Sequence, residues 1–232
     1  ESEWKWSSTG TPLSYTNWAS GGPKVKELES KWSDLFNYTR SVATSSGTDG
    51  CINSCLTLYD LKDAKRNVSE VIVPALSFIA TSNVVRAAGL VPKFVVVKRE
   101  TLNIDETKIE EAINENTVAI QVVHTMGRMA EMDVICEIAE RHGLIVIEDA
   151  CEAHGAKFKD TLVGHWGHMS IYSFYVAHLV CCGEGGMIST NDDKIADLVF
   201  STRSHGRPVN SVYFDHQRAG INVDAAINEY LH

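Results

Sequence analysis

Short runs of apolar residues alternate along the chain with stretches in which apolar residues recur at helical spacing. The runs predict strands at 41–44, 71–73, 94–97, 118–123, 144–147, 170–175 and 187–190. The helical spacing predicts helices at 23–36, around 52–59, and at 78–88, 106–113, 132–142 and 195–203. Strands that are apolar throughout are typical of a parallel sheet covered on both faces. We therefore expect an α/β fold with three αβα layers and a mostly parallel central sheet.

Composition narrows the classes of protein to which this chain can belong. Hydrophobic residues make up 44%, which is enough for a substantial core, and the net charge is -9 with a pI near 5.4. An acidic chain without clustered Lys and Arg is not expected to bind nucleic acid. No apolar run approaches the roughly 20 residues that span a bilayer, and residues 1–22 lack the pattern of a signal peptide. Six scattered cysteines without a C-x-x-C pair favour a reducing cytoplasm.

The first 22 residues differ from the rest. They contain Trp4, Trp6 and Trp18 among Ser, Thr and Gly, and this stretch resembles a fragment of a C-type lectin domain. No paired cysteines follow, so we interpret residues 1–22 as an atypical Trp-rich arm that packs on the body or on a partner subunit.

Two local patterns predict a binding site. The apolar run 144–147 ends in Glu148 and Asp149, and open α/β sheets bind ligands at the carboxyl ends of their strands. The turn Ser46-Gly47-Thr48 leads into a helix, where free backbone N–H groups favour a phosphate. A Ser/Gly turn of this kind is also common as simple punctuation before a helix.

Three further residues extend the predicted site. Together with the phosphate cradle and Asp149 they suit a flat, phosphorylated ring whose nitrogen an acid keeps protonated. Phe78 could stack on such a ring, Ser173 could bind its phosphate, and His178 could transfer protons. The alternatives are a core position for Phe78 or His178 and a backbone hydrogen bond for Ser173. His165 and His168 have no evident third ligand, so we predict no metal site.

Several ordered motifs carry a family resemblance. The segments VIVPALSFIATSNVVRAAGLVPKFV, TLNID, IEDACEAHGA, SFYVAH, GEGGMIST and SHGR resemble the DegT/DnrJ/EryC1/StrS sugar aminotransferases. The resemblance runs from about residue 21 to residue 222. It implies a pyridoxal-phosphate enzyme of the aspartate aminotransferase fold. Residues 23–222 would form its large domain, with 223–232 a truncated tail that stops before the family's small C-terminal domain.

One departure from the family pattern changes the expected chemistry. His178 occupies the position of the lysine that binds the cofactor covalently in the aminotransferases, and residues 169–193 contain no lysine. The same exchange marks the nucleotide-sugar 3-dehydratases, which include GDP-4-keto-6-deoxymannose 3-dehydratase and bind pyridoxal or pyridoxamine phosphate without a covalent bond. No cysteine follows Cys182, which points to the branch without an iron–sulfur cluster.

The resemblance also implies roles that the pattern alone does not give. Glu152 would lie near the phenolic oxygen of the cofactor, and Asn222 would reach the phosphate of a neighbouring subunit in a homodimer. The expected function is C3 dehydration of an NDP-4-keto-6-deoxy sugar by His178 and Asp149, with L-glutamate as a possible amino donor. The alternatives are a nucleotide-sugar aminotransferase and a non-catalytic fragment that binds a cofactor or a sugar nucleotide.

Overall fold

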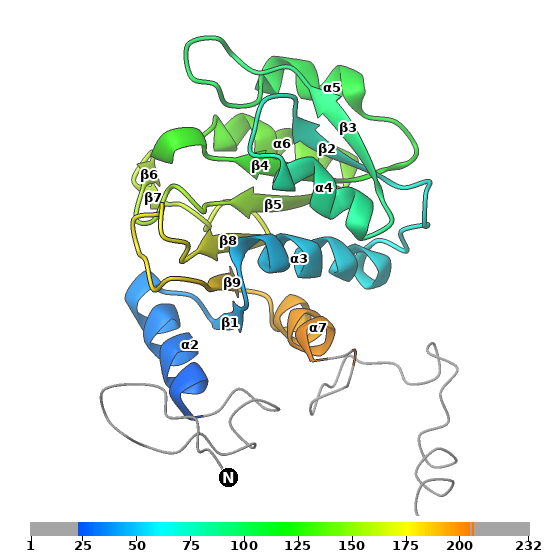
Figure 1. The fold of residues 1–232 in the computed structure, drawn as a ribbon. Helices are drawn as coiled ribbons and strands as arrows, with labels where there is room; N and C mark the ends of the chain where they lie inside the picture. The colour runs from blue at the N-terminus through cyan, green and yellow to red at the C-terminus, as the bar shows by residue number, and fades with distance from the viewer. Residues whose placement is uncertain (1–22, 205, 207–232) are drawn as a thin grey trace, which may run out of the picture.

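The computed structural model describes residues 23–204 and residue 206, which fold as alternating helices and strands around one large sheet (Figure 1). The predicted 1–22 arm, the 223–232 tail, Asn222 and His205 lie outside the described residues. The α-helices are α2 (Pro23–Phe36), α3 (Gly47–Leu61), α4 (Ala80–Ala87), α5 (Ile109–Ala112), α6 (Met132–His142) and α7 (Asp193–Arg203). The main strands are β1 (Arg40–Thr44), β2 (Glu70–Pro74), β3 (Val91–Val95), β4 (Thr117–Val123), β5 (Ile145–Asp149), β8 (Met169–Ser173) and β9 (Gly186–Thr190). A small hairpin pairs β6 (Lys157–Phe158) with β7 (Thr161–Leu162).

The described strands form a seven-stranded sheet in the order β1-β9-β8-β5-β4-β2-β3. The five strands from β8 to β3 are parallel to one another, whereas β9 runs antiparallel to both β8 and β1. This confirms the mostly parallel sheet that the apolar runs predict. The carboxyl ends of β4, β5 and β8 therefore meet at one edge, where a parallel sheet places its ligands.

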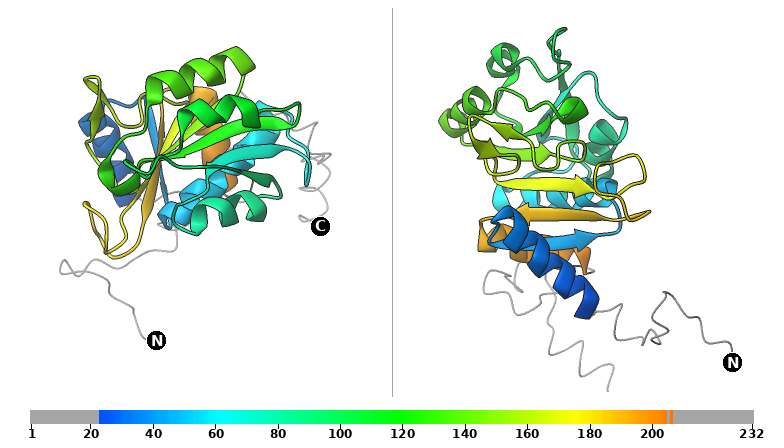
Figure 2. Two further views of the ribbon diagram at one scale, coloured as in Figure 1. Left: turned by 90° about the horizontal axis from the view of Figure 1, so that it is seen from above. Right: turned by 90° about the vertical axis from the view of Figure 1, so that its left-hand side faces the viewer.

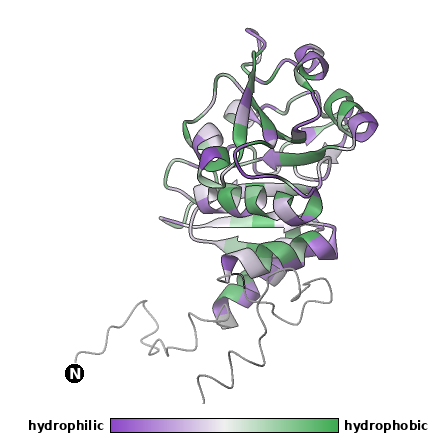
Figure 3. Cartoon of the chain, turned by 90° about the vertical axis from the view of Figure 1, so that its right-hand side faces the viewer, coloured by the Kyte–Doolittle hydropathy of each residue, from purple (hydrophilic) through white to green (hydrophobic). Residues whose placement is uncertain are grey.

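Helices cover both faces of the sheet, so the fold has three layers (Figure 2). Buried residues of α3, α4 and α7, including Leu58, Val85 and Val199, pack in one cluster on one face. Trp32 of α2 and Ile135 of α6 belong to a second cluster on the other face. Figure 3 shows the apolar central strands between helices that also carry polar residues. Burial of side chains on both faces explains why the central strands β2, β4 and β5 are mainly apolar.

Several predicted boundaries are wrong. The strand predicted at 94–97 is observed as β3 (Val91–Val95), which begins and ends earlier than predicted. It is an edge strand on which Phe94 is exposed, so the apolar run 94–97 does not coincide with the segment that pairs in the sheet. The helix at 78–88 begins only at Ala80. The helix at 106–113 is a 3-10 turn, η1 (Glu106–Lys108), followed by the single turn α5. The strand at 170–175 ends at Ser173, because Phe174 turns to bond Gly185 across a loop.

Local signals explain where several helices begin and end. Ser46 and Asp192 cap α3 and α7, since their side chains accept the amides of Asp49 and Ile195. Gly143 ends α6 in a left-handed conformation with a φ of 61°. Within the described residues no helix is long and apolar enough to cross a membrane.

Candidate active site

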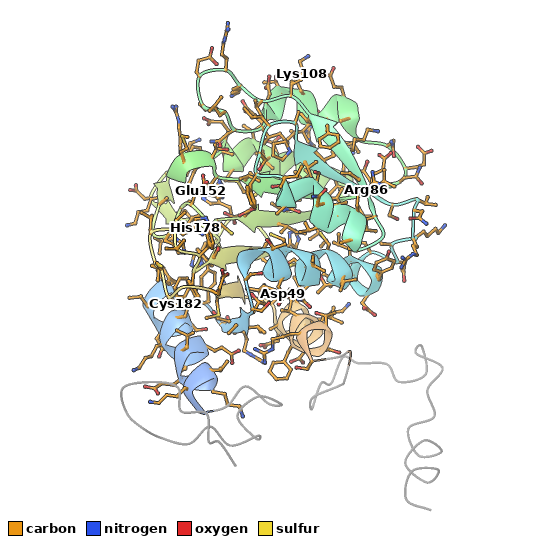
Figure 4. All side chains as sticks on the ribbon, viewed as in Figure 1. Asp49, Arg86, Lys108, Glu152, His178 and Cys182 are labelled. Carbon is orange, nitrogen blue, oxygen red and sulfur yellow. The ribbon has the colours of Figure 1, made fainter. Side chains whose placement is uncertain are left out.

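A cavity of about 710 Å³ opens at the carboxyl ends of β4, β5 and β8, beside the first turn of α3. Its lining includes every described residue that the sequence predicted for the site: Ser46, Gly47, Thr48, Phe78, Asp149, Glu152, Ser173 and His178. Figure 4 shows Glu152 and His178 at this edge of the sheet. The fold thus brings together residues from four separate segments of the chain.

The first turn of α3 forms one end of the cavity. The Ser46 side chain accepts the Asp49 amide at 3.0 Å, and the Ser46 carbonyl accepts the Gly50 amide at 3.0 Å. The amides of Gly47 and Thr48 precede these and have no acceptor within the helix, because a helix leaves its first N–H groups unpaired. These amides and the positive end of the helix dipole suit an anionic group.

Asp149 ends β5 and carries a half-buried carboxylate into the cavity. Its Oδ1 accepts the Cys151 amide at 3.2 Å, and its Oδ2 lies 4.0 Å from Cys51 Sγ. Burial raises the pKa of Asp149, and hydrogen bonds from Cys151 oppose this only in part. A cationic group bound at Oδ2 would relieve the cost of burying this charge.

His178 lies in the loop between β8 and β9, which returns to the sheet through two bonds made by the Phe174 backbone, to Gly185 and Cys182. The His178 amide donates to the Tyr175 carbonyl at 2.9 Å. Its Nδ1 is buried and has no hydrogen-bond partner within the described part of the chain. A buried, unpaired ring nitrogen is costly in a folded protein, which makes this nitrogen a candidate for binding a ligand or exchanging a proton.

Phe78 lies in the segment between β2 and α4, with 74% of its surface exposed. This exposure excludes the alternative of a core position in the described chain. The ring lines the cavity beside Leu76 and is free to stack on a flat ligand.

Glu152 contacts Met126, which no pattern in the sequence predicts for the site. Its Oε2 accepts the amide of Met126 at 2.6 Å. Met126 follows β4 in a left-handed backbone conformation with a φ of 53°, which is uncommon for a residue other than glycine. Ser173 has a local bond as well, since its Oγ accepts the Tyr175 amide at 3.3 Å.

Other lining residues were missed by the sequence analysis. These include Cys51, Leu102, Thr125, Cys151, Tyr175 and Glu184. Thr125 and Cys151 are each the second residue after the end of β4 and β5, so the strand-end rule could have found them. His165 and His168 lie elsewhere and bond the main chain: His165 Nε2 lies 2.8 Å from the Phe36 carbonyl, and His168 Nδ1 accepts the Val146 amide at 3.1 Å.

The described residues fit a pyridoxal-phosphate type of cofactor. The α3 amides suit its phosphate, the Asp149 carboxylate suits its ring nitrogen, and Phe78 offers an exposed face for its ring. At Gly47 the backbone of α3 lies close to β8, because an added Cβ would stand 2.7 Å from Ser173 Cβ. No lysine of the described residues lines the cavity.

Comparison with known proteins agrees with this fold. A relative called pleiotropic regulatory protein, from Geobacillus stearothermophilus, is 40% identical over 189 residues, covering 80% of this chain and 49% of the relative. GDP-perosamine synthase of Caulobacter vibrioides is 36% identical over 200 residues, covering 86% and 53%. The structure of the E. coli GDP-4-keto-6-deoxy-D-mannose-3-dehydratase with bound hydrated PLP superposes with a TM-score of 0.76 at 32% identity, covering 86% and 54%.

The chain thus spans about half the length of the relatives that it matches. Residues 11–226 match the sequence pattern of one family along nearly the whole chain. The resemblance of the motifs and the expected fold are both confirmed, and the chain belongs to the DegT/DnrJ/EryC1/StrS aminotransferase family.

Proposed function

We propose that this chain forms the cofactor-binding part of a 3-dehydratase that uses pyridoxal or pyridoxamine phosphate to remove the C3 hydroxyl of an NDP-4-keto-6-deoxy sugar. The observation that carries the proposal is His178, which stands in the cavity where the family's aminotransferases have a lysine. An imidazole can move a proton but forms no stable covalent bond to the cofactor carbonyl.

Each described site residue then has a role in binding or proton transfer. Ser46, Gly47, Thr48 and Ser173 hold the cofactor phosphate, with Asn222 of a neighbouring subunit. Phe78 packs on the ring, Asp149 keeps the ring nitrogen protonated, and Glu152 lies at the phenolic oxygen. When bound, the cofactor supplies an electron sink for breaking bonds beside the sugar carbonyl. His178 removes a proton within the cavity and can return one to the departing C3 hydroxyl.

Several features support the remaining parts of the proposal. Exposed apolar residues line the cavity or adjoin its lining residues in sequence, which favours burial against a second copy in a homodimer. Leu76 and Phe78 line it, and Ile79, Met126, Val176 and Leu179 each stand next to a lining residue. Six free cysteines in the described residues favour a reducing cytoplasm. The similar dehydratase of E. coli, which is named for a GDP sugar, supports a sugar nucleotide as substrate. L-glutamate as the donor that regenerates the amine form of the cofactor is what the family resemblance implies.

A nucleotide-sugar aminotransferase is the second candidate, because GDP-perosamine synthase is among the similar proteins. That activity would need a lysine from outside the described cavity. A non-catalytic fragment that binds the cofactor or a sugar nucleotide is the third. Because the chain covers only about half of each relative, this third candidate needs a test of its own.

The first experiment records the absorbance of the purified chain with pyridoxal phosphate before and after borohydride. Wild type should bind the cofactor reversibly and keep no covalent adduct, whereas His178→Lys should trap one. Glu184→Lys is the matched control, since it adds a lysine at an exposed position of the cavity lining without this role, and it should trap none. A covalent adduct in wild type would contradict the proposal, and so would a lack of binding in every protein.

A second experiment supplies pyridoxamine phosphate and GDP-4-keto-6-deoxymannose and identifies the released sugar by mass spectrometry. A 3-deoxy sugar supports the dehydratase. An amino sugar supports the aminotransferase instead. Cofactor binding without any released product supports the non-catalytic alternative.

A further inference from the structure

A fully buried pair of ionisable side chains lies directly behind the cavity and has no role in the proposed function. His124 follows the end of β4, Glu148 lies in β5, and neither side chain is exposed. His124 Nε2 lies 3.1 Å from Glu148 Oε2. Burying a carboxylate is costly unless its oxygens are well bonded, so the pair requires an explanation.

Glu148 is well supplied with hydrogen-bond donors from one loop. The Gly164 amide donates to its Oε2 at 2.8 Å, and the Trp166 and Gly167 amides donate to its Oε1 at 2.9 and 2.5 Å. Three backbone donors stabilise the ionised form of a carboxylate. With His124 as the fourth donor, both oxygens of Glu148 are satisfied.

The hydrogen bond at the other ring nitrogen of His124, Nδ1, shows which nitrogen carries the proton. The Ala130 amide donates to His124 Nδ1 at 3.3 Å. A backbone amide has only a proton to offer, so Nδ1 accepts, and the proton of the neutral ring is on Nε2, where it points at Glu148. His124 thus joins the buried carboxylate to the far end of the turn 124–130.

That turn presents an amide to the cavity. The Gly127 and Arg128 amides close it onto the carbonyls of His124 and Thr125, and Met126 takes the left-handed conformation within it. The Met126 amide then donates to Glu152 Oε2. Without a brace, a non-glycine residue in this conformation would tend to relax, because the left-handed region costs about 1 kcal/mol or more.

Asn103 is a second brace on the same turn. Its Oδ1 accepts the Thr125 amide at 3.0 Å, and its Nδ2 donates to the Arg128 carbonyl at 2.8 Å. Asn103 is buried and does not take part in the Glu148 cluster. The two side chains therefore hold the Met126 turn from different directions.

We propose that His124 is a positioning residue whose Nδ1 fixes the 124–130 turn, so that the Met126 amide holds the Glu152 carboxylate in place for the cofactor. The inference rests on the cofactor-binding part of the proposed function and not on the dehydration. His124 would act on the site through the turn, and its bond to Glu148 would serve mainly to fix the ring and stabilise the fold.

Two substitutions of His124 each keep one of its two hydrogen bonds, the one to Glu148 or the one from the Ala130 amide, and remove the other. In His124→Asn, Oδ1 can take the place of Nδ1 as acceptor for Ala130, but the side chain is too short to reach Glu148. In His124→Gln, the amide nitrogen can reach Glu148, but no acceptor remains for Ala130. The proposal expects the Gln variant to lose cofactor affinity and the Asn variant to keep it, although Asn should be the less stable of the two.

The experiment measures three quantities for wild type and both variants. Amide hydrogen exchange of Met126 is recorded by NMR without cofactor, the Kd for pyridoxamine phosphate by absorbance, and the thermal midpoint by circular dichroism. In His124→Gln we expect Met126 to exchange about threefold to tenfold faster and the Kd to rise by a similar factor, the effect of one lost hydrogen bond. In His124→Asn both should stay within about twofold of wild type.

A double variant tests the route. In a Glu152→Ala background, adding His124→Gln should leave the Kd unchanged within about twofold, because the linked carboxylate is already gone. Asn103→Ala, which loosens the same turn without touching Glu148, should speed Met126 exchange and raise the Kd as His124→Gln does. This variant keeps the test available should either His124 variant fail to fold.

Three outcomes would overturn the inference. The first is that the Met126 exchange rate and the Kd change only in proportion to the thermal midpoint, and the second is that His124→Asn and His124→Gln change them equally. The third is that His124→Gln raises the Kd in the Glu152→Ala background as much as in wild type. If wild type binds no pyridoxamine phosphate while Met126 exchange still separates Gln from Asn, the proposed function fails and the brace on the turn stands. If wild type binds it and exchange does not separate the variants, only the role of His124 fails.

Discussion

Gly47 at the start of α3 and Ser173 at the end of β8 approach so closely that no side chain fits between them. A Cβ on Gly47 would stand 2.7 Å from Ser173 Cβ and 3.0 Å from Cys151 Sγ. The absence of a side chain therefore lets the first turn of α3 close onto the strand that carries Ser173. The same approach brings the free helix amides and the Ser173 hydroxyl to one wall of the cavity.

Gly47→Ala should consequently lower both stability and cofactor affinity. Forcing a methyl group into a filled site costs about 1–3 kcal/mol of unfolding free energy. Urea denaturation and a pyridoxal-phosphate titration measure the two effects. Adding Ser173→Gly to Gly47→Ala removes the closest contact, so the double variant should be less destabilised than the sum of the single variants. Strict additivity would show that the clash is not the cause.

Asp149→Asn should stabilise the cofactor-free protein at neutral pH while weakening cofactor binding. Burial raises the pKa of Asp149, so the folded state binds its proton more tightly than the unfolded state does. Ionisation of Asp149 therefore costs folding free energy, and this cost grows as the pH rises from the unfolded value of about 3.9 through the raised value. Asn keeps an acceptor for the Cys151 amide but has no charge.

Urea denaturation of Asp149→Asn at pH 4 and pH 7 measures this effect. The variant should exceed wild type in stability at pH 7, and the difference should shrink towards pH 4. Loss of a charged partner should raise the Kd for pyridoxal phosphate about 10- to 100-fold, which corresponds to about 1.5–3 kcal/mol. A variant that is less stable by the same amount at both pH values would contradict the assigned cause.

The ion pair of Glu29 and Arg203 should contribute to the free energy of unfolding and not to cofactor binding in the cavity. Arg203 Nη1 donates to Glu29 Oε1 at 2.5 Å and to the Ala43 carbonyl at 2.9 Å, which joins α2, β1 and α7. Both side chains are about 15% exposed or less. Glu29→Ala should cost about 1–3 kcal/mol of unfolding free energy because it leaves a largely buried charge unpaired. The Kd for pyridoxal phosphate should not change.

The matched control for this ion pair is the exposed one between Lys31 and Glu27 on α2. Both partners are well exposed, so Lys31→Ala should cost less than about 0.5 kcal/mol. Equal losses for Glu29→Ala and Lys31→Ala would show that burial does not decide the contribution of these pairs.

The sequence predicts those parts of the site that lie at the ends of buried elements. Asp149 follows an apolar run, and the predicted turn from Ser46 to Thr48 proves to be the N-cap and first two residues of α3. The preference of parallel sheets for ligands at their carboxyl ends and of helix N-termini for anions locates these residues. His178 is different, because its segment has no distinctive periodicity: its ring makes it a candidate for proton transfer, and only the family resemblance gives it the lysine position. The contact from Met126 to Glu152 depends on a left-handed turn that no composition signal marks.

Two of the errors in the predicted elements have a common cause. The strand predicted at 94–97 runs past the end of β3 to Val96, and the helix predicted at 78–88 begins too early at Phe78, because these residues are apolar, but both side chains are exposed. Val96 follows an edge strand, and Phe78 lies on a connection that borders the cavity. Apolar residues define elements only where they are buried, and hydrophobicity alone does not distinguish a core position from a surface that binds a ligand or a partner.

Because of His154, the free energy of unfolding should decrease as the pH falls through the mildly acidic range. Its ring packs against Trp32, Tyr172 and Phe174, and both ring nitrogens are buried. Burial lowers the pKa of His154 to about 4, and the nearby His178 adds to the effect. Between the unfolded value of about 6.5 and pH 4 the unfolded state binds more protons, so stability falls as the pH falls.

His154→Phe should remove this part of the acid sensitivity. Phenylalanine keeps the aromatic packing and cannot take up a proton. Partial exposure of His154 reduces the expected contribution to about 1–2 kcal/mol of unfolding free energy between pH 6.5 and pH 4. Urea denaturation across this range should give a flatter profile for the variant and a similar stability at pH 7. An unchanged slope would mean that His154 already has a partner or solvent contact that lets it ionise in the folded protein, and the acid sensitivity would then belong to other groups.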